Sequence, residues 1–274
     1  MNTTITHEPT APASGGLNEL GVALGNIVTI TDRNLRRLLR VPTLIAFATV
    51  QPVLFVLLFT YAFGGAIHPS GTTHYVDYLL PGVMVLALGF GASQTGVALA
   101  DDLATGMIDR FRALPMTRVA VLAGRATADA VRNLFVITLM IGVGTAIGFR
   151  FHTSPAAALA LIGIVLALGV ALSFINALLG LLVRDPEAAG LAGLLPIILL
   201  VFTSSTLVPV ATMPGWLQTL ARANPITVIV DALRTLALGG PTRTPVLHAL
   251  AWIGALLLIA IPMAITRYRH TTRP

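Results

Sequence analysis

The residues of this chain that could do chemistry are few, and the densest group is acidic. Asp101, Asp102 and Asp109 lie within nine positions of one another, and arginines stand beside them. Paired carboxylates can serve as general acid and base, so these three are the candidates for transferase chemistry. The neighbouring arginines favour charge pairing as the interpretation. We therefore name no catalytic residue.

The basic residues exclude one class of nucleotide site. All 17 of them are arginine, and a standard P-loop ends in Gly-Lys-Ser/Thr, so the chain has no lysine to supply. Cysteine is absent, which excludes disulfides, thiolate metal sites and cysteine nucleophiles. The six histidines are scattered and no pair has ligand spacing on one helical face. We predict no cofactor site and no metal site in this chain.

The composition is that of a membrane protein. Of the 274 residues, 55% are hydrophobic and 10% are charged, against about 25% charged in soluble proteins. A bilayer core about 30 Å thick needs roughly 20 apolar residues of helix to cross it, and a spanning segment must satisfy its own backbone. The chain is predicted to be an all-α integral membrane protein with six spans, at 43–64, 78–100, 133–149, 156–183, 188–209 and 246–266.

The arginines predict the orientation in the cell membrane. With both termini in the cytoplasm, only four of the 17 lie outside, namely Arg150, Arg222, Arg234 and Arg243. This asymmetry follows the positive-inside rule and accounts for the net charge of +6 without a nucleic-acid partner. The predicted parts are a disordered tail (1–16), an amphipathic interfacial helix (17–41), a permease domain (42–266) and a cytoplasmic tail (267–274).

The interfacial helix and the first long connection carry most of the arginines. Arg33, Arg36, Arg37 and Arg40 fall on the face opposite the leucines, as expected for a helix at the membrane surface. The connection at 101–132 contains a short predicted helix whose apolar ridge lies beside charged residues. Spacing alone leaves it open whether this helix is an ordinary loop helix or a partner's docking site. Its residues are Gly106, Met107, Ile108, Asp109, Arg110, Phe111, Arg112, Leu114 and Pro115.

The six predicted spans contain no Asp, Glu, Lys or Arg, so they offer no relay for a coupling ion. Active transport would then need energy from a partner. The main polar residues at depth are Gln51, Gln94, Asn176, Thr203 and Ser204, which are either helix–helix hydrogen-bond partners or part of a substrate path. A second connection, at about 210–245, has an apolar, proline-broken opening half. We expect this half to dip into the bilayer from outside as a re-entrant segment.

Two blocks of residues resemble a known family. The first runs from Tyr75 to Leu134 and contains Tyr78-Leu79-Leu80-Pro81-Gly82 and Gly106-x-x-Asp109-Arg110-Phe111-x-x-Leu114-Pro115. The second contains Ser204-Ser205, Pro209, Met213-Pro214-x-Trp216-Leu217, Asn224-Pro225-Ile226-Thr227 and Asp231-Ala232-Leu233-Arg234. Together they resemble the permease subunits of type-2 ABC exporters, and most of all the daunorubicin/doxorubicin-resistance branch.

The resemblance implies an ATP-driven exporter of hydrophobic or amphipathic compounds, either drug-like molecules or lipids. It implies a separate ATPase subunit that binds ATP and Mg, and a second permease that is an identical copy or a related chain. Residues 106–115 would be the coupling helix on the ATPase, and the 17–40 helix would lie at the cytoplasmic interface. The external gate would include Pro209, Pro214, Trp216, Asn224 and Pro225.

Two other functions remain open from the sequence. One is a membrane-embedded transferase acting on lipid-linked substrates, with the three aspartates above as its candidates. The other is a non-transporting membrane subunit that assembles a cytoplasmic partner. That reading explains the charged connection but not the external Pro/Trp block.

Overall fold

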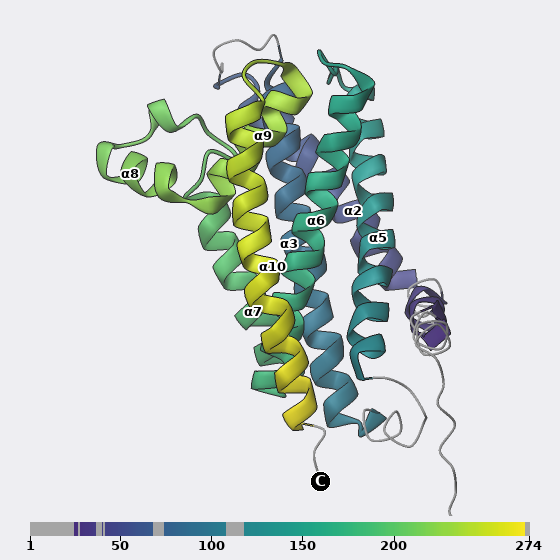
Figure 1. The fold of residues 1–274 in the computed structure, drawn as a ribbon. Helices are drawn as coiled ribbons and strands as arrows, with labels where there is room; N and C mark the ends of the chain where they lie inside the picture. Colours follow the sequence, from purple (N-terminus) through teal and green to yellow (C-terminus); the bar gives the residue numbers. More distant parts are fainter. Residues whose placement is uncertain are drawn as a thin grey trace, which may run out of the picture.

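The computed structural model describes residues 25–26, 28–36, 40, 42–67, 74–107 and 118–271, and all regular structure within them is helical. Six long helices run alternately up and down one bundle (Figure 1). They are α2 (Pro42–Phe63), α3 (Tyr75–Ala104), α5 (Arg118–Ala146), α6 (Pro155–Val183), α7 (Pro186–Phe202) and α10 (Arg243–Thr271). Three short elements lie between α7 and α10, namely η1 (Val210–Thr212), α8 (Gly215–Ala223) and α9 (Pro225–Leu238).

Three helices begin with the same pair of residues, a polar N-cap followed by proline. At α6, α7 and α9 a polar residue caps the helix and the next residue is proline. The caps are Ser154, Asp185 and Asn224, whose side-chain oxygens accept backbone N–H groups of the first turn. A cap satisfies a donor that has no partner inside the helix, and proline at the first position has no N–H to lose. The starts of these three helices are therefore determined by adjacent residues.

Helix α3 is the centre of the bundle, in contact with α2, α5, α6, α7 and α9. Most of its side chains are buried, including Leu79, Val83 and Leu99. Its closest neighbour is α6, where Gly96 faces Gly180 so tightly that a Cβ on Gly180 would overlap the carbonyl oxygen of Gly96. Small residues let two helix backbones approach without hydrophobic driving force, as is typical of membrane helices.

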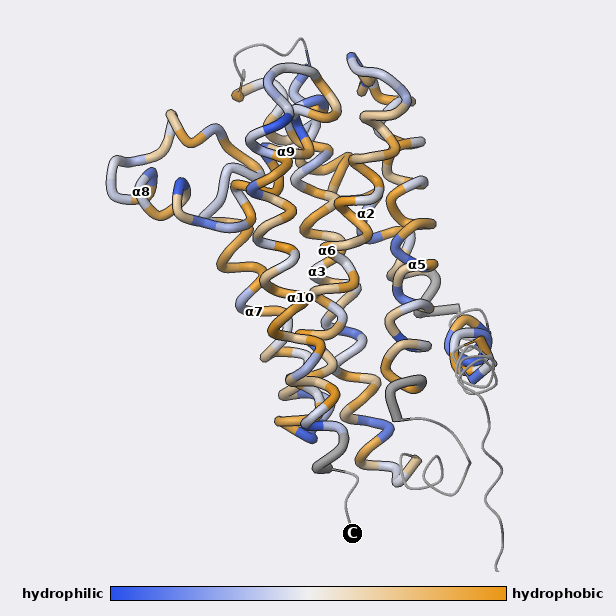
Figure 2. The backbone as a smooth tube through the Cα atoms, in the orientation of Figure 1, coloured by the Kyte–Doolittle hydropathy of each residue, from blue (hydrophilic) through white to orange (hydrophobic). Residues whose placement is uncertain are grey.

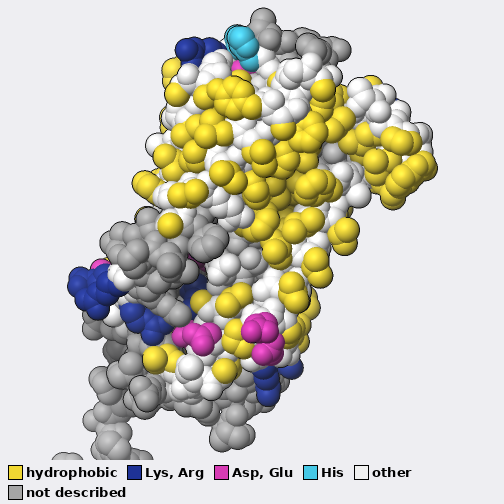
Figure 3. All heavy atoms as spheres, turned by 180° about the vertical axis from the view of Figure 1, so that it is seen from behind, with side chains coloured by type: hydrophobic (Ala, Val, Ile, Leu, Met, Phe, Trp, Pro, Cys, Tyr) yellow, Lys and Arg dark blue, Asp and Glu magenta, His cyan; other side chains and the backbone are white. Residues whose placement is uncertain are grey.

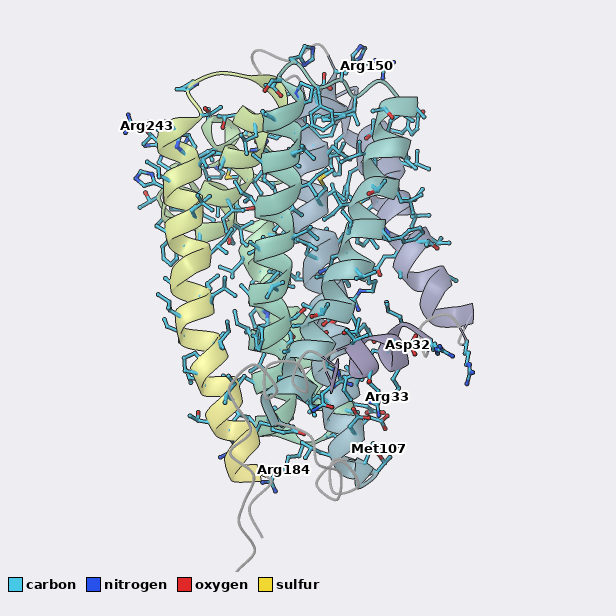
Figure 4. The ribbon with its side chains drawn as sticks, turned by 45° about the vertical axis from the view of Figure 1, so that its right-hand side comes forward. Asp32, Arg33, Met107, Arg150, Arg184 and Arg243 are labelled. Atoms are coloured by element: carbon cyan, nitrogen blue, oxygen red, sulfur yellow. The ribbon has the colours of Figure 1, made fainter. Side chains whose placement is uncertain are left out.

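The outside of the bundle is apolar between two polar ends (Figures 2 and 3). Arg150 and Arg243 lie at one end, whereas Met107 and Arg184 lie at the other (Figure 4). Within the described part of the chain, four helical segments are long and apolar enough to cross a membrane: Tyr75–Ala104, Val121–Ala146, Pro155–Val183 and Arg243–Tyr268. Ala48–Phe63 and Pro186–Phe202 are apolar but shorter. The prediction of an all-helical membrane protein is confirmed, with four clear candidate spans.

The structure corrects the third predicted span. We expected a short helix at 133–149, preceded by a charged connection over 101–132. Instead α5 begins at Arg118, and α3 continues to Ala104, so the connection between them is reduced to 105–117. Arg125, Asp129 and Arg132 therefore lie inside a bundle helix, which overturns the expectation that the helices carry no charge. Unpaired charges would have ended the membrane helix, but these three residues are paired with opposite charges and can lie within it.

The connection predicted at about 210–245 is largely helical. Its opening half forms η1 and α8, and α8 projects sideways from the bundle (Figure 1). Its re-entrant path in the bilayer stays a prediction. The second half forms α9, which packs against α3, α6 and α10. Arg234, which we had placed in an external loop, is buried in α9. The fifth span is shorter than the predicted 188–209, since α7 ends at Phe202.

Gly180→Ala tests the α3–α6 contact. The added methyl group would meet backbone atoms of Gly96, which cannot rotate away, so overpacking should cost about 1–3 kcal/mol of stability. The apparent melting temperature of the purified protein in detergent should fall. Gly163→Ala is the matched control in the same helix, because its Cβ would meet nothing within 4 Å. Equal melting temperatures for the two variants would contradict this packing.

Candidate functional site

A cavity of about 440 Å³ lies where helical residues 28–36 meet α2, α3 and α5. Its walls are largely apolar and include Pro52, Phe55, Phe90 and Val136. One region is polar, and the side chains there are Asn34, Gln51, Gln94, Asp101, Arg125, Asp129, Arg132 and Asn133. Pockets for small molecules are commonly about 300–1,000 Å³, mostly apolar, with a few placed polar groups. The cavity has the form of a site for an amphipathic ligand.

Two ion pairs lie beside the cavity where α3 meets α5. Arg125 of α5 donates to the Asp102 carboxylate of α3 at 2.9 Å. Further along α5, Arg132 pairs with Asp129 of the same helix at 3.2 Å, and the Thr95 hydroxyl of α3 donates to the Asp129 carboxylate at 2.5 Å. The side chains of Asp102, Arg125, Asp129 and Arg132 are at most 14% exposed. Burial of a charge is tolerated because each has an opposite charge in hydrogen-bonding distance.

The helical residues 28–36 run across the bundle axis near its Met107 end (Figure 4). The Thr31 hydroxyl donates to the carbonyl of Gly124 in α5 at 3.0 Å, and Arg33 lies 3.8 Å from the Asp102 carboxylate. Arg36 forms an exposed pair with Asp32, and this hydrogen bond raises the pKa of Arg36 above its ordinary value. The crossing helix thus reaches both α3 and α5.

The four arginines predicted for that helix do not all have the same surroundings. Arg36 and Arg40 are exposed, whereas Arg33 is half-buried against Asp102. Arg37 lies outside the described residues. The stretch predicted to contact a partner also lies mostly outside them, since only Gly106 and Met107 belong to the described part. Gly106 adopts φ +66°, a left-handed conformation that ends α3 and that glycine adopts at little cost.

The polar residues predicted at depth separate into three places. Gln51 and Gln94 line the cavity. The Asn176 amide packs against Gly193 between α6 and α7 and donates to the carbonyl of Leu172 in its own helix, away from the cavity. Thr203 and Ser204 lie beyond the end of α7 and donate to carbonyls of that helix. The structure therefore brings together two of these five residues.

A second cluster, at the Arg150 end, surrounds the buried guanidinium of Arg234. Its five N–H groups find five acceptors: the carbonyls of Tyr78, Ser205 and Thr206, the Ser205 hydroxyl and the Asp231 carboxylate, at 2.6–3.1 Å. The guanidinium carbon also lies 3.5 Å from the centre of the Tyr78 ring. Five donors are all that an arginine has, so this side chain is saturated.

Further hydrogen bonds fix the segment after α7 to its neighbours. The Tyr75 hydroxyl donates to the Leu207 carbonyl and the Tyr78 hydroxyl to the Ser205 carbonyl, each at 2.7 Å. The Asn224 amide donates to the Leu200 carbonyl at 2.7 Å. Together with Arg234 these bonds close the Arg150 end of the bundle, joining α3, α7 and α9.

The predicted external-gate residues occupy the boundaries of the short elements. Pro209 precedes η1, Pro214 precedes α8, and Asn224 with Pro225 begins α9. Trp216 projects from α8 and is 70% exposed. In the described part of the chain, no group of three His, Asp or Glu could hold a metal ion.

Sequence reasoning missed Arg234, Arg125, Asp129 and Arg132 as bundle residues. One signal could have found part of this set, because Asp-x-x-Arg occurs at 129–132 and again at 231–234. Residues three apart lie on the same face of a helix, so each pair neutralises itself. Arg125 lies four residues from Asp129, but Asp129 pairs with Arg132, and only the fold brings Asp102 to Arg125.

Comparisons with known proteins give one consistent result. The family model described as ABC-2 type transporter matches residues 25–238. The daunorubicin resistance ABC transporter permease protein DrrB1 of Streptomyces coeruleorubidus is 30% identical, covering 97% of this chain and 96% of that protein. The probable doxorubicin resistance permease protein DrrC of Mycobacterium tuberculosis is 27% identical over 94% of each chain. A putative transport permease, ycf38, of Porphyra purpurea is 26% identical over 76% of this chain and 72% of that protein.

Arg234→Lys should destabilise the protein even though the charge is kept. Lysine has three donors in place of five, so at least two buried acceptors lose their partners, at a cost of about 2–4 kcal/mol. The apparent melting temperature measures the loss. The control is Arg222→Lys on α8, where the exposed arginine donates only one long hydrogen bond, at 3.4 Å to Gln218. A similar, small change in both variants would show that the saturated guanidinium does not hold α9 in place.

Proposed function

We propose that this chain, which belongs to the ABC-2 type transporter family, exports amphipathic compounds. The compounds would pass through the bundle described above. The chain is the permease subunit of such a transporter and a multi-pass protein of the cell membrane. ATP is hydrolysed by a separate ATPase subunit, which binds the nucleotide and its Mg. The recognition made from the two sequence blocks is therefore confirmed.

The cavity beside α3 is the observation that carries the proposed substrate. Its walls combine phenylalanines with the amides of Gln51 and Gln94, as a molecule with an apolar body and a few polar groups requires. Gln94 is exposed in a helix whose neighbouring positions are mostly buried, which suits a polar contact that changes as substrate passes. Two relatives named for daunorubicin or doxorubicin resistance support drug-like compounds as one substrate class. Lipids are the other.

The proposed topology has six spans and both termini in the cytoplasm. The six long helices alternate in direction, and α2 and α7 are apolar although shorter than the four clear candidates. The Met107 end would face the cytoplasm, with Arg184 and the crossing helix beside it, and the Arg150 end would face outward. This choice follows the positive-inside distribution of arginine.

A second permease, identical or related, would cover the exposed side of α2 and α7. Leu191, Leu195 and Leu199 of α7 are all more than half exposed and recur every four residues, so they form one stripe. Leu54 and Leu58 form a similar stripe on α2. The cavity is bordered by α2 and by Pro186 at the start of α7. A partner packed there would separate the polar lining of the cavity from lipid.

Coupling to the ATPase is proposed for residues 106–115. This segment connects α3 to α5, and the Asp102–Arg125 pair joins these two helices on either side of it. A push on the segment would therefore move two bundle helices as a unit, together with the crossing helix that contacts both. ATP binding must favour one packing by a few kcal/mol to shift the populations.

The decisive experiment is uphill transport in proteoliposomes. Vesicles that contain this permease with its ABC ATPase partner should accumulate doxorubicin or a fluorescent lipid when ATP is supplied, whereas the permease alone should neither hydrolyse ATP nor transport. Transport by the isolated chain, or group transfer to a lipid-linked acceptor without an ATPase, would overturn the proposal. The second result would favour the transferase alternative, and a complex that assembles without ever transporting would favour the assembly subunit.

Phe111→Ala tests the coupling segment. The variant should insert and fold normally, yet lose most substrate-stimulated ATP hydrolysis, because an apolar contact with the ATPase would be missing. The measurements are co-purification of the ATPase and its stimulated rate. Phe135→Ala is the control, since this phenylalanine on α5 is 57% exposed and lies outside the segment. Wild-type assembly and stimulation in Phe111→Ala would remove this segment from the mechanism.

A further inference from the structure

The polar region of the cavity holds donors without acceptors. We propose that it binds the phosphodiester group of a membrane lipid, with the lipid's apolar part along the phenylalanine wall. The inference deepens the proposed function, on which it rests, by naming the chemical group that the cavity recognises. It is carried by unpartnered hydrogen-bond donors in the cavity lining.

Two of the residues that line the cavity have donor atoms with no partner among the described residues. They are the Nη1 atom of Arg125 and the Nδ2 atom of Asn34, both fully buried. Arg125 itself is only 8% exposed. Its other terminal nitrogen is used by Asp102, so the orphan nitrogen is a spare donor on a fixed guanidinium. A buried donor without an acceptor costs about 1–3 kcal/mol, which a ligand oxygen would recover.

Among the fully buried atoms of the described cavity lining, those without a partner are all donors, and this indicates what the ligand must offer there. No fully buried acceptor of a described lining residue lacks a partner. A ligand rich in acceptor oxygens fits, and arginine with an amide is a suitable pair for a phosphate. The Asp129 carboxylate is already occupied by Arg132 and Thr95.

The charges at the cavity favour a ligand with few negative charges. Arg125 and Arg132 both line the cavity and already have carboxylate partners, Asp102 and Asp129, and Asp101 adds one further acid to the lining. A phosphodiester adds one negative charge at the spare guanidinium donor, whereas a phosphomonoester would add nearly two beside Asp101. The apolar wall of Pro52, Phe55, Phe90 and Val136 would bury the first part of an acyl chain. A free phosphate would leave this wall uncovered.

The test is lipid binding at equilibrium, without nucleotide, by the full-length chain. The protein is purified in a detergent that lacks phosphate and titrated with phosphatidylglycerol, and the bound lipid is counted by native mass spectrometry. One phosphatidylglycerol should bind, diacylglycerol should not compete, and soluble glycerophosphoglycerol should compete only weakly. Competition by the soluble headgroup as strong as by the lipid would overturn the lipid assignment. Equal binding of diacylglycerol would overturn the phosphate contact.

Asn34→Asp is the first variant, because it replaces the spare donor with a carboxylate of the same shape. It should weaken phosphatidylglycerol binding about tenfold, the loss expected for one hydrogen bond to a charged group. Asn26→Asp is the matched control. Asn26 is helical, lies eight residues earlier and has the same unpartnered amide nitrogen, but it does not line the cavity. Equal weakening in both variants would show a general charge effect and refute the site.

Arg125→Lys is the second variant, and it keeps the proposal testable if Asn34→Asp fails to fold. Lysine preserves the ion pair with Asp102, but its single nitrogen cannot contact Asp102 and also stand at the Nη1 position, so binding should again fall about tenfold with the melting temperature little changed. Unchanged binding in a folded Arg125→Lys protein would refute the site. Such a failure is distinguishable from failure of the proposed function, because ATP-driven transport of doxorubicin would persist.

Discussion

A charged side chain that is buried away from water needs an opposite charge or hydrogen-bond partners beside it. This requirement determines how the helices of the bundle are arranged. An unpaired ion in an apolar interior costs several kcal/mol, more than most single contacts return. Arg234 meets the constraint by using all five donors, and Arg132 and Arg125 meet it with Asp129 and Asp102. Because each arrangement needs atoms from two or more segments, the helices are fixed where the charges are satisfied.

The two ends of the bundle meet this constraint differently. At the Arg150 end most acceptors are backbone carbonyls of a segment that has little freedom, and every donor of Arg234 is used. At the Met107 end Asp102 lies between Arg125 at 2.9 Å and Arg33 at 3.8 Å, on two different helices. One carboxylate with two arginines can shorten one contact as it lengthens the other. The Arg150 end is therefore held rigidly, whereas the Met107 end allows small rearrangements.

Much of the fold could be predicted from the sequence, because hydrophobic length is a local property. Span ends at α2 and α6 were placed to within a residue of the observed helices. The third span was wrong because a charged residue was taken as the end of a membrane segment. Asp129 and Arg132 are compatible with burial only as a pair, and Asp102 with Arg125 becomes a pair only after α3 and α5 have packed.

The site was predicted less well than the fold. Gln51 and Gln94 were candidates from the sequence and both line the cavity, but Asn176, which has the same polarity at similar depth, faces Gly193 instead. Helical spacing predicts on which face of its helix a residue lies, but it does not predict which helix packs against that face. Arg234 was placed in a loop because the preceding prolines hid a helix. The role of residues 106–115 stays a prediction, since most of them lie outside the described chain.

Helix α3 is held at both extremities, near Tyr78 by the guanidinium cluster and at Asp102 by the arginines of two other helices. These residues are 24 positions apart, about 36 Å along a continuous helix. A rod anchored in this way is a lever: a tilt of a few degrees at the Asp102 anchor becomes a sideways displacement of about 2 Å or more at the Tyr78 anchor over that length. The molecule therefore needs no separate signalling pathway between the two ends of the bundle, because the single helix α3 extends from one end to the other.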